Sequence, residues 1–241
     1  MNISDIIKSK VARFSKGYVF TFNDFIDMVE SKEGLIKALN RLAASGEIAK
    51  LAKGKYYKPE QSPFGELPPN QYQVVKDLLE RDGRIEGYIT GLSIYNTLGL
   101  TTQVSNTIQI GKNEVRSSMK RGKYSISFVK QKNTLTRENM PLLQLLDVLR
   151  FLKKIPDSKI DRSCKVMQSL MSKLSEKELE VLVRLALKYP PSTRALLGVI
   201  LDSLGKVKLT EKLRKSLNPI SIYKIPGVSG VFSSASEWSI K

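Results

Sequence analysis

The chain has 241 residues, 41% of them hydrophobic, which is enough for two globular domains with cores of their own. Its formal net charge of +17 favours polyanionic partners, with nucleic acid first and an anionic membrane surface second. The chain has a single cysteine, Cys164, and no histidine, which excludes an intramolecular disulfide, a Ser-His-Asp triad and the usual zinc sites.

The N-terminal residues contain no continuous apolar signal segment, and the lone cysteine suits a reducing compartment. The longest apolar run, 195–201, is far too short to cross a bilayer. We therefore expect a cytoplasmic protein with no membrane partner.

The first sixty residues carry helix, strand and turn signals in the order of a winged helix-turn-helix. Apolar residues at helical spacing predict a first helix over residues 4–14, which Lys16-Gly17 ends. A short strand near 18–20 follows, and Thr21 with Asp24 forms a capping-box pattern that starts a second helix.

Residues 31–58 predict an amphipathic third helix followed directly by a lysine-rich hairpin. Gly46 ends the helix, and a turn at Lys53-Gly54 joins two short strands, near 48–51 and 55–58. The apolar face of this helix comprises Leu35, Ala38, Leu39, Leu42 and Ala43.

Proline and glycine positions then suggest the domain boundaries. We expect a winged helix-turn-helix domain over residues 1–60, a stiff Pro-rich linker over 61–70, and a larger C-terminal domain over 71–241. The fold class is predicted as α+β, with a mixed α/β C-terminal domain that becomes mainly helical after residue 140. The apolar tail, which contains Trp238, is expected to pack onto this domain.

The solvent face of the third helix and the hairpin supply residue types that contact duplex DNA. Lysine and arginine donate to guanine, and asparagine pairs with adenine, in the major groove, whereas hairpin lysines meet phosphates. The predicted contacts are Lys32, Lys37, Asn40 and Arg41 on the helix and Lys50, Lys53, Lys55 and Lys58 on the hairpin. A possible second basic surface comprises Arg116, Lys120, Arg121 and Lys123. The alternative is a helix-turn-helix that contacts protein only, with its charges merely solvated.

The sequence lacks the glycine patterns of nucleotide-binding loops, and we predict no enzyme, no catalytic residues, no cofactor and no metal. A metal-dependent nuclease is the alternative, with carboxylates from Asp157 and Asp161 or from Glu176, Glu178 and Glu180. Both sets lie at helix starts, where acidic residues also have a structural reason to occur.

The stretch GYITGLSIYNTLGLTTQ resembles the AbiEi-type antitoxins of bacterial abortive-infection toxin–antitoxin systems. The likeness is carried by Tyr88, Gly91, Leu98-Gly99-Leu100-Thr101 and Gln103, with Gly54-Lys55-Tyr56-Tyr57 in the wing, and covers roughly residues 1–150. It implies a DNA-binding antitoxin and transcriptional autorepressor that binds promoter repeats in double-stranded DNA and opposes a nucleotidyltransferase-like toxin in phage defence. The alternative is a stand-alone winged-helix transcriptional regulator with a ligand-sensing C-terminal domain.

Overall fold

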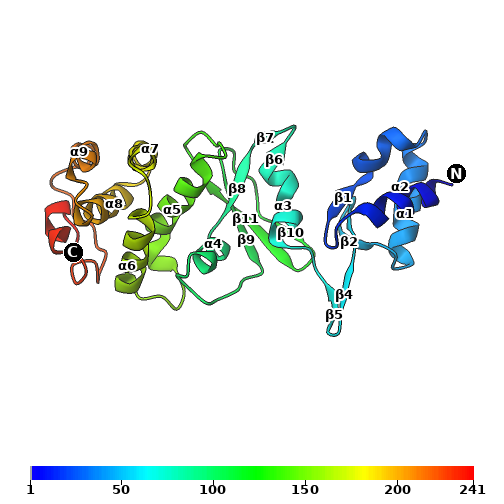
Figure 1. The fold of residues 1–241 in the computed structure, drawn as a ribbon, viewed down its shortest axis with the longest axis horizontal. Helices are drawn as coiled ribbons and strands as arrows, with labels where there is room; N and C mark the ends of the chain where they lie inside the picture. Colours follow the sequence, from blue (N-terminus) through cyan, green and yellow to red (C-terminus); the bar gives the residue numbers. More distant parts are fainter. Residues whose placement is uncertain (1) are drawn as a thin grey trace. The chain divides into compact units, whose positions relative to one another are not determined.

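The computed structural model describes residues 2–241, which form two compact units (Figure 1). The first unit comprises the chain up to Leu78 together with Met119–Ser125, and the second comprises Leu79–Ser118 and Ile126–Lys241. Each unit contains helices and strands, so the α+β class is as predicted. The first unit extends beyond the predicted boundary near residue 60, up to Leu78, and also includes a later segment of the chain.

The first unit begins with helices that are each capped by a polar side chain. Asn2 accepts a hydrogen bond from the backbone N–H of Ser4, and the predicted Thr21–Asp24 capping box is present. The predicted second helix is present as a 3₁₀ helix. The elements are α1 (Ile3–Arg13), β1 (Val19–Thr21), η1 (Phe22–Met28), α2 (Lys32–Ala44), β2 (Ala49–Ala52) and β3 (Lys55–Tyr57).

A three-stranded antiparallel sheet closes this group of helices. Strand β3 lies in the centre, between β1 and β2, and Phe20 of β1 is paired with Tyr56 of β3. Their rings stack with centroids 6.2 Å apart. The residues buried between the sheet and the helices are Ile7, Val11, Phe20, Phe25, Leu35, Ala38, Leu39, Leu42, Ile48 and Tyr56.

The segment predicted as a linker, 61–70, contains a strand hairpin and belongs to the first unit. Strands β4 (Glu60–Ser62) and β5 (Gly65–Leu67) pair antiparallel, and α3 (Gln71–Leu79) follows. The prolines of this segment lie outside both strands. Proline is as common in turns and at strand ends as in linkers, so the prolines alone did not distinguish a hairpin from a linker.

A further hairpin of the first unit comes from a later part of the chain. It is formed by β10 (Met119–Arg121) and the start of β11 (Tyr124–Lys130). Gly122 at its turn has a φ of +53°, which favours glycine. Its N–H donates to the carbonyl of Leu51 in β2 at 3.0 Å, so the two hairpins are joined.

The second unit contains a sheet in which β8, β9 and the end of β11 are neighbours. Strands β8 and β9 are antiparallel, with Tyr88 opposite Gly111. The predicted strand-to-helix turn over 87–103 is present, and Gly99 follows the end of its helix. These elements are β6 (Glu80–Arg81), β7 (Arg84–Ile85), β8 (Gly87–Thr90), α4 (Leu92–Thr97) and β9 (Thr107–Lys112).

The rest of the second unit is mainly helical, as expected after residue 140. The capping box of Ser175 and Glu178 starts α7, as predicted. Helix α8 is central, since every residue over 195–201 is buried. The elements are α5 (Asn139–Phe151), η2 (Leu152–Lys154), α6 (Ile160–Met171), α7 (Glu176–Ala186), α8 (Pro191–Ser203), α9 (Val207–Lys215) and η3 (Ser233–Trp238).

Trp238 fixes the C-terminal tail on α8. Its indole N–H donates to Asp202 at 2.7 Å, and the guanidinium of Arg214 lies 4.3 Å from its ring. A Cβ atom at Gly198 would lie 2.2 Å from the indole ring, so the ring packs directly on the helix backbone. The apolar tail is therefore packed onto the second unit.

Across residues 2–241, no helix combines the length and the apolar character needed to cross a membrane.

Candidate functional site

Helix α2 has one buried apolar face and one solvent-exposed basic face. Leu35, Leu39 and Leu42 are almost completely buried. Ser31 caps the helix, accepting a hydrogen bond from the N–H of Gly34 at 3.1 Å. The four predicted contact residues Lys32, Lys37, Asn40 and Arg41 are all exposed.

Two of these four side chains also hold the unit together. The Arg41 guanidinium donates to the hydroxyl of Ser4 in α1. The carbonyl oxygen of Asn40 accepts from the hydroxyl of Tyr56 at 2.8 Å, which fixes α2 against strand β3. Lys32 lies 4.7 Å above the ring of Phe22. Lys37 has no hydrogen bond or ion pair within residues 2–241, so it is the most available cation of this face.

The hairpin of β2 and β3 divides its lysines into two classes. Lys50 and Lys53 are exposed. Lys55 instead forms an ion pair with Asp77 of α3 at 3.0 Å. Lys58 donates to the carbonyl oxygens of Ala12 and Phe14 at the end of α1, at 2.8 and 2.9 Å. The ammonium groups of Lys55 and Lys58 are therefore engaged inside the unit, and their prediction as free phosphate contacts needs correction.

The proposed second basic surface is not one surface of exposed cations. Arg116 is exposed and belongs to the second unit, whereas Lys120, Arg121 and Lys123 belong to the first. Arg121 is buried, and its guanidinium contacts both carboxylate oxygens of Asp77 and the carbonyl of Val74. Its prediction as a surface contact was wrong, because the N–H groups of its guanidinium already donate to Asp77 and Val74.

Lys120 and Lys123 are exposed on the hairpin that is bonded to β2. The first unit therefore presents exposed lysines on α2 and on two joined hairpins. Spacing in sequence hid this arrangement, because some sixty residues separate the two hairpins along the chain. The set comprises Lys32, Lys37, Lys50, Lys53, Lys120 and Lys123.

Asp77 forms ion pairs with one cation from each of these two hairpins, Lys55 and Arg121. Burial by itself would raise the pKa of Asp77, but hydrogen bonds from Arg121 and Lys55 outweigh burial and lower that pKa below its ordinary value. The carboxylate thus stays ionised at neutral pH and fixes one cation from each hairpin.

A polar network that the sequence did not signal lies inside the second unit. Asp147 is fully buried and accepts hydrogen bonds from Tyr88 at 2.7 Å, Thr90 at 2.9 Å and Tyr189 at 2.9 Å. The side-chain amide of Gln131 donates to both tyrosine oxygens at 2.8 Å. Burial raises the pKa of Asp147 and of both tyrosines.

These contacts satisfy the buried carboxylate with three hydroxyl donors, so the network fixes β8, α5 and the segment before α8. Of its members only Tyr88 was singled out from the sequence, through the family resemblance. Asp147 sits among leucines in the apolar repeat of α5, and an isolated acid in such a helix was its only signal.

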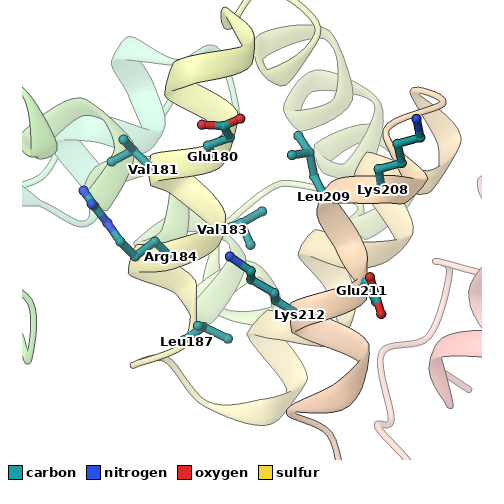
Figure 2. Close-up of a pocket in the computed structure, with 9 residues that line it drawn as sticks. All are labelled: Glu180, Val181, Val183, Arg184, Leu187, Lys208, Leu209, Glu211 and Lys212. Carbon is teal, nitrogen blue, oxygen red and sulfur yellow. The ribbon is translucent and has the colours of Figure 1, made fainter.

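A groove of about 510 Å³ lies between α7 and α9 (Figure 2). Its floor is apolar, with Val183 and Leu209 facing the space between the helices. Charges of both signs surround it, because α7 contributes Glu180 and Arg184 and α9 contributes Lys208, Glu211 and Lys212. The opposite charges compensate one another locally, so the groove does not select an anion.

Three of the five carboxylates considered for a metal site are engaged in other contacts. Asp157 accepts from Gln103, Glu176 pairs with Lys206, and Glu178 caps α7. Within residues 2–241 there is no cluster of three or more histidine, cysteine, aspartate or glutamate side chains that could hold a metal ion.

Comparison with known proteins places the chain in a family. The model of one family matches residues 5–179, which include parts of both units. The chain belongs to DUF6088, a family of unknown function. No curated protein matches the chain.

Among solved structures, the chain is similar to the crystal structure of the RV2827C protein from Mycobacterium tuberculosis, with a TM-score of 0.60 and 16% sequence identity. The alignment covers 100% of this chain and 91% of that chain. At this level of identity, the likeness shows a shared fold and says nothing about activity.

Proposed function

We propose that this member of the DUF6088 family is a DNA-binding antitoxin that represses its own operon through a winged helix-turn-helix in the first unit. Helix α2 is the recognition helix, and the β2–β3 hairpin is the wing. The observation that carries the DNA-binding half is the exposed basic face of α2, opposite a face that is almost completely buried.

The dimensions and residue types of α2 suit the major groove. Its 13 residues extend over about 20 Å at 1.5 Å per residue. Lys37 and the free amide nitrogen of Asn40 supply donors that base edges accept, and Asn40 is held in position by Tyr56. Base readout is thus assigned to Lys37 and Asn40, with Lys32 and Arg41 beside them.

Phosphate contacts are assigned to the exposed lysines of the two hairpins, Lys50, Lys53, Lys120 and Lys123. Lys55 and Lys58 support the wing through their own contacts. Phosphate contacts fix the orientation of the protein on the duplex and carry no base preference of their own.

The antitoxin half rests on the resemblance of residues 88–103 and the wing to AbiEi-type antitoxins. It implies a nucleotidyltransferase-like toxin as the functional partner, encoded beside this chain. Co-expression of that neighbouring gene with and without this chain tests it: growth restored only by this chain supports antitoxin activity, and a harmless neighbour contradicts it.

The DNA-binding half is tested by fluorescence anisotropy with duplex DNA from upstream of the chain's own gene, at several salt concentrations. Lys37→Ala and Asn40→Ala are expected to weaken binding to the cognate duplex by about 1–3 kcal/mol each and to relax base preference. Lys16→Ala is the matched control, because Lys16 lies in the loop after α1, outside α2 and both hairpins.

Equal weakening by Lys37→Ala and Lys16→Ala would show that only net charge matters and would contradict readout by α2. Unchanged affinity in both α2 variants, with weaker binding in Lys53→Ala, would assign DNA contact to the wing alone.

A further inference from the structure

A second hollow lies wholly within the second unit and is surrounded by cations. Its volume is about 350 Å³. The cations come from three places in the chain: the end of β11 with the residues just after it, helix α5, and the segment that precedes α8. They are Lys130, Lys132, Arg150 and Lys188.

Three of these four cations donate to backbone carbonyls, and the ammonium group of Lys132 has no hydrogen bond or ion pair within residues 2–241. Lys130 donates to the carbonyl of Asn113, Arg150 to the carbonyl of Lys130 at 3.3 Å, and Lys188 to the carbonyl of Lys132 at 3.3 Å. Within residues 2–241, no carboxylate lines the hollow and none forms an ion pair with these side chains. Arg150 also interacts electrostatically with the buried carboxylate of Asp147. The four cations around the hollow still outnumber that one carboxylate, and an anion bound among them would reduce their mutual repulsion.

The floor of the hollow is polar and rigid. It contains Gln131 and Tyr189, which are bonded to each other at 2.8 Å and to the buried network around Asp147. Both side chains are almost completely buried. The one carboxylate of that network, Asp147, is buried and accepts hydrogen bonds from three hydroxyl groups. The hollow therefore has four cations around it, and the network contributes only this one buried carboxylate.

The start of helix α8 contributes further positive potential. Pro190 and Pro191 line the hollow, and α8 extends for 13 residues from Pro191. The N-terminal end of a helix carries a partial positive charge, which favours an anion nearby. The two prolines have no N–H to donate, so this contribution is one of charge and not of hydrogen bonding.

We propose that this hollow binds the terminal phosphate group of a small phosphorylated molecule. A forked guanidinium and three ammonium groups match the oxygens of a phosphate monoester, which carries more negative charge than a diester. The volume lies within the range of small-molecule sites. All the residues involved belong to the second unit, so the site does not depend on DNA binding by the first.

Isothermal titration calorimetry of the full chain tests the proposal, with pyrophosphate and adenosine 5′-monophosphate as probes in chloride buffer. Wild type is expected to bind one probe per chain with saturation. The double variant Arg150→Gln with Lys188→Gln is expected to weaken binding about tenfold or more, because charged hydrogen bonds are lost. Lys165→Gln with Lys177→Gln is the matched control: both lysines are exposed on other helices of the same unit, and the change in charge is equal.

Because Arg150 also stacks on Phe151, a second variant guards against misfolding. Lys132→Gln with Lys188→Gln changes only exposed side chains and is expected to weaken binding in the same direction. No saturable binding by wild type, or equal weakening in the control pair, would overturn the proposal.

The source of the phosphate is separated with thymidylyl-thymidine, whose single phosphate is an internal diester. Weaker binding of this diester than of the mononucleotide supports a small phosphorylated ligand. Equal or tighter binding would assign the hollow to a nucleic-acid backbone and contradict the proposal. Lys37→Ala should leave binding of the mononucleotide unchanged, which distinguishes this site from the proposed DNA-binding surface.

Discussion

Two hairpins of the first unit, β2–β3 and β10–β11, have closely similar tips, Lys53-Gly54-Lys55-Tyr56 and Arg121-Gly122-Lys123-Tyr124, yet they use their cations in opposite order. In the first tip, the cation after the glycine, Lys55, pairs with Asp77, and the one before it is exposed. In the second tip, the cation before the glycine, Arg121, is buried against the same Asp77, and Lys123 is exposed. One carboxylate therefore takes one cation from each hairpin and leaves the other exposed.

The number of basic residues at a hairpin tip therefore overstates the charge that is available to a ligand. The type of cation also differs between the two sites at Asp77. The buried site has arginine, whose planar fork contacts both carboxylate oxygens, and the partly exposed site has lysine, a single point charge. Four predictions test whether Asp77 determines the difference.

The largest effect is expected from Asp77→Ala, which leaves the buried guanidinium of Arg121 without its counter-ion. We expect the free energy of unfolding to fall by about 3 kcal/mol, measured by urea denaturation. Asp27→Ala in η1 is the control, since Asp27 is exposed and forms no ion pair within residues 2–241; it should change stability by less than about 0.5 kcal/mol. Equal losses in the two variants would refute a special role for Asp77.

A smaller effect is expected from Arg121→Lys, which keeps the positive charge but removes the guanidinium group that contacts both carboxylate oxygens of Asp77. Loss of one charged hydrogen bond to Asp77 and of the bond to Val74 should cost about 1–2 kcal/mol by the same assay. The reciprocal change, Lys123→Arg on the exposed side of that turn, should be nearly neutral. If Lys123→Arg were the more damaging change, the assignment of roles within this tip would be reversed.

The contribution of Asp77 should also depend on pH. Its pKa is lower in the folded protein than its ordinary value of 3.8, so the folded state holds the ionised form more strongly than the unfolded state does. The stabilisation is present in full above that ordinary pKa and is lost as the pH falls through the folded value. The difference in Tm between wild type and Asp77→Asn should therefore be largest near pH 7 and shrink below about pH 4. A difference that grew on acidification would contradict the sign of the pKa shift.

The smallest effects on folding are expected from the exposed partners. Lys53→Ala should reduce the slope of log affinity for duplex DNA against log salt by about one unit, with little change in stability. Lys55→Ala should do the reverse, since its ammonium is already paired with Asp77 and its loss costs about 1 kcal/mol of stability. Identical salt slopes for the two variants would show that Lys53 and Lys55 do not differ in their availability to DNA.

The sequence predicted local structure well wherever a local interaction produces it. The capping boxes at Thr21 and Ser175 and the apolar face of α2 depend on neighbours three or four residues away, and each is present. The 3₁₀ geometry of η1 was missed, because both helix types share these start signals.

The sequence could not predict which basic side chains stay free, because that depends on partners distant in the chain. Asp77 lies 22 residues from Lys55 and 44 from Arg121, and the carbonyls that bind Lys58 lie 44 and 46 residues away. The residues that suggested the family behave similarly: Tyr88 and Leu100 are buried, so they report the fold and not a binding surface. The structure was therefore needed to separate the free cations from the paired ones among the basic residues that the sequence had indicated.

The passage of the chain between the two units has a practical consequence for dissecting the protein. A fragment that ends at Leu78 would keep Asp77 but lose Met119–Ser125, and with them the buried partner of its carboxylate. Strand β11 starts in one unit and ends in the other, so no single cut yields both units whole. Truncation would thus separate Asp77 from one of its two cations, and point substitutions in the intact chain are the sound way to assign activities to each unit.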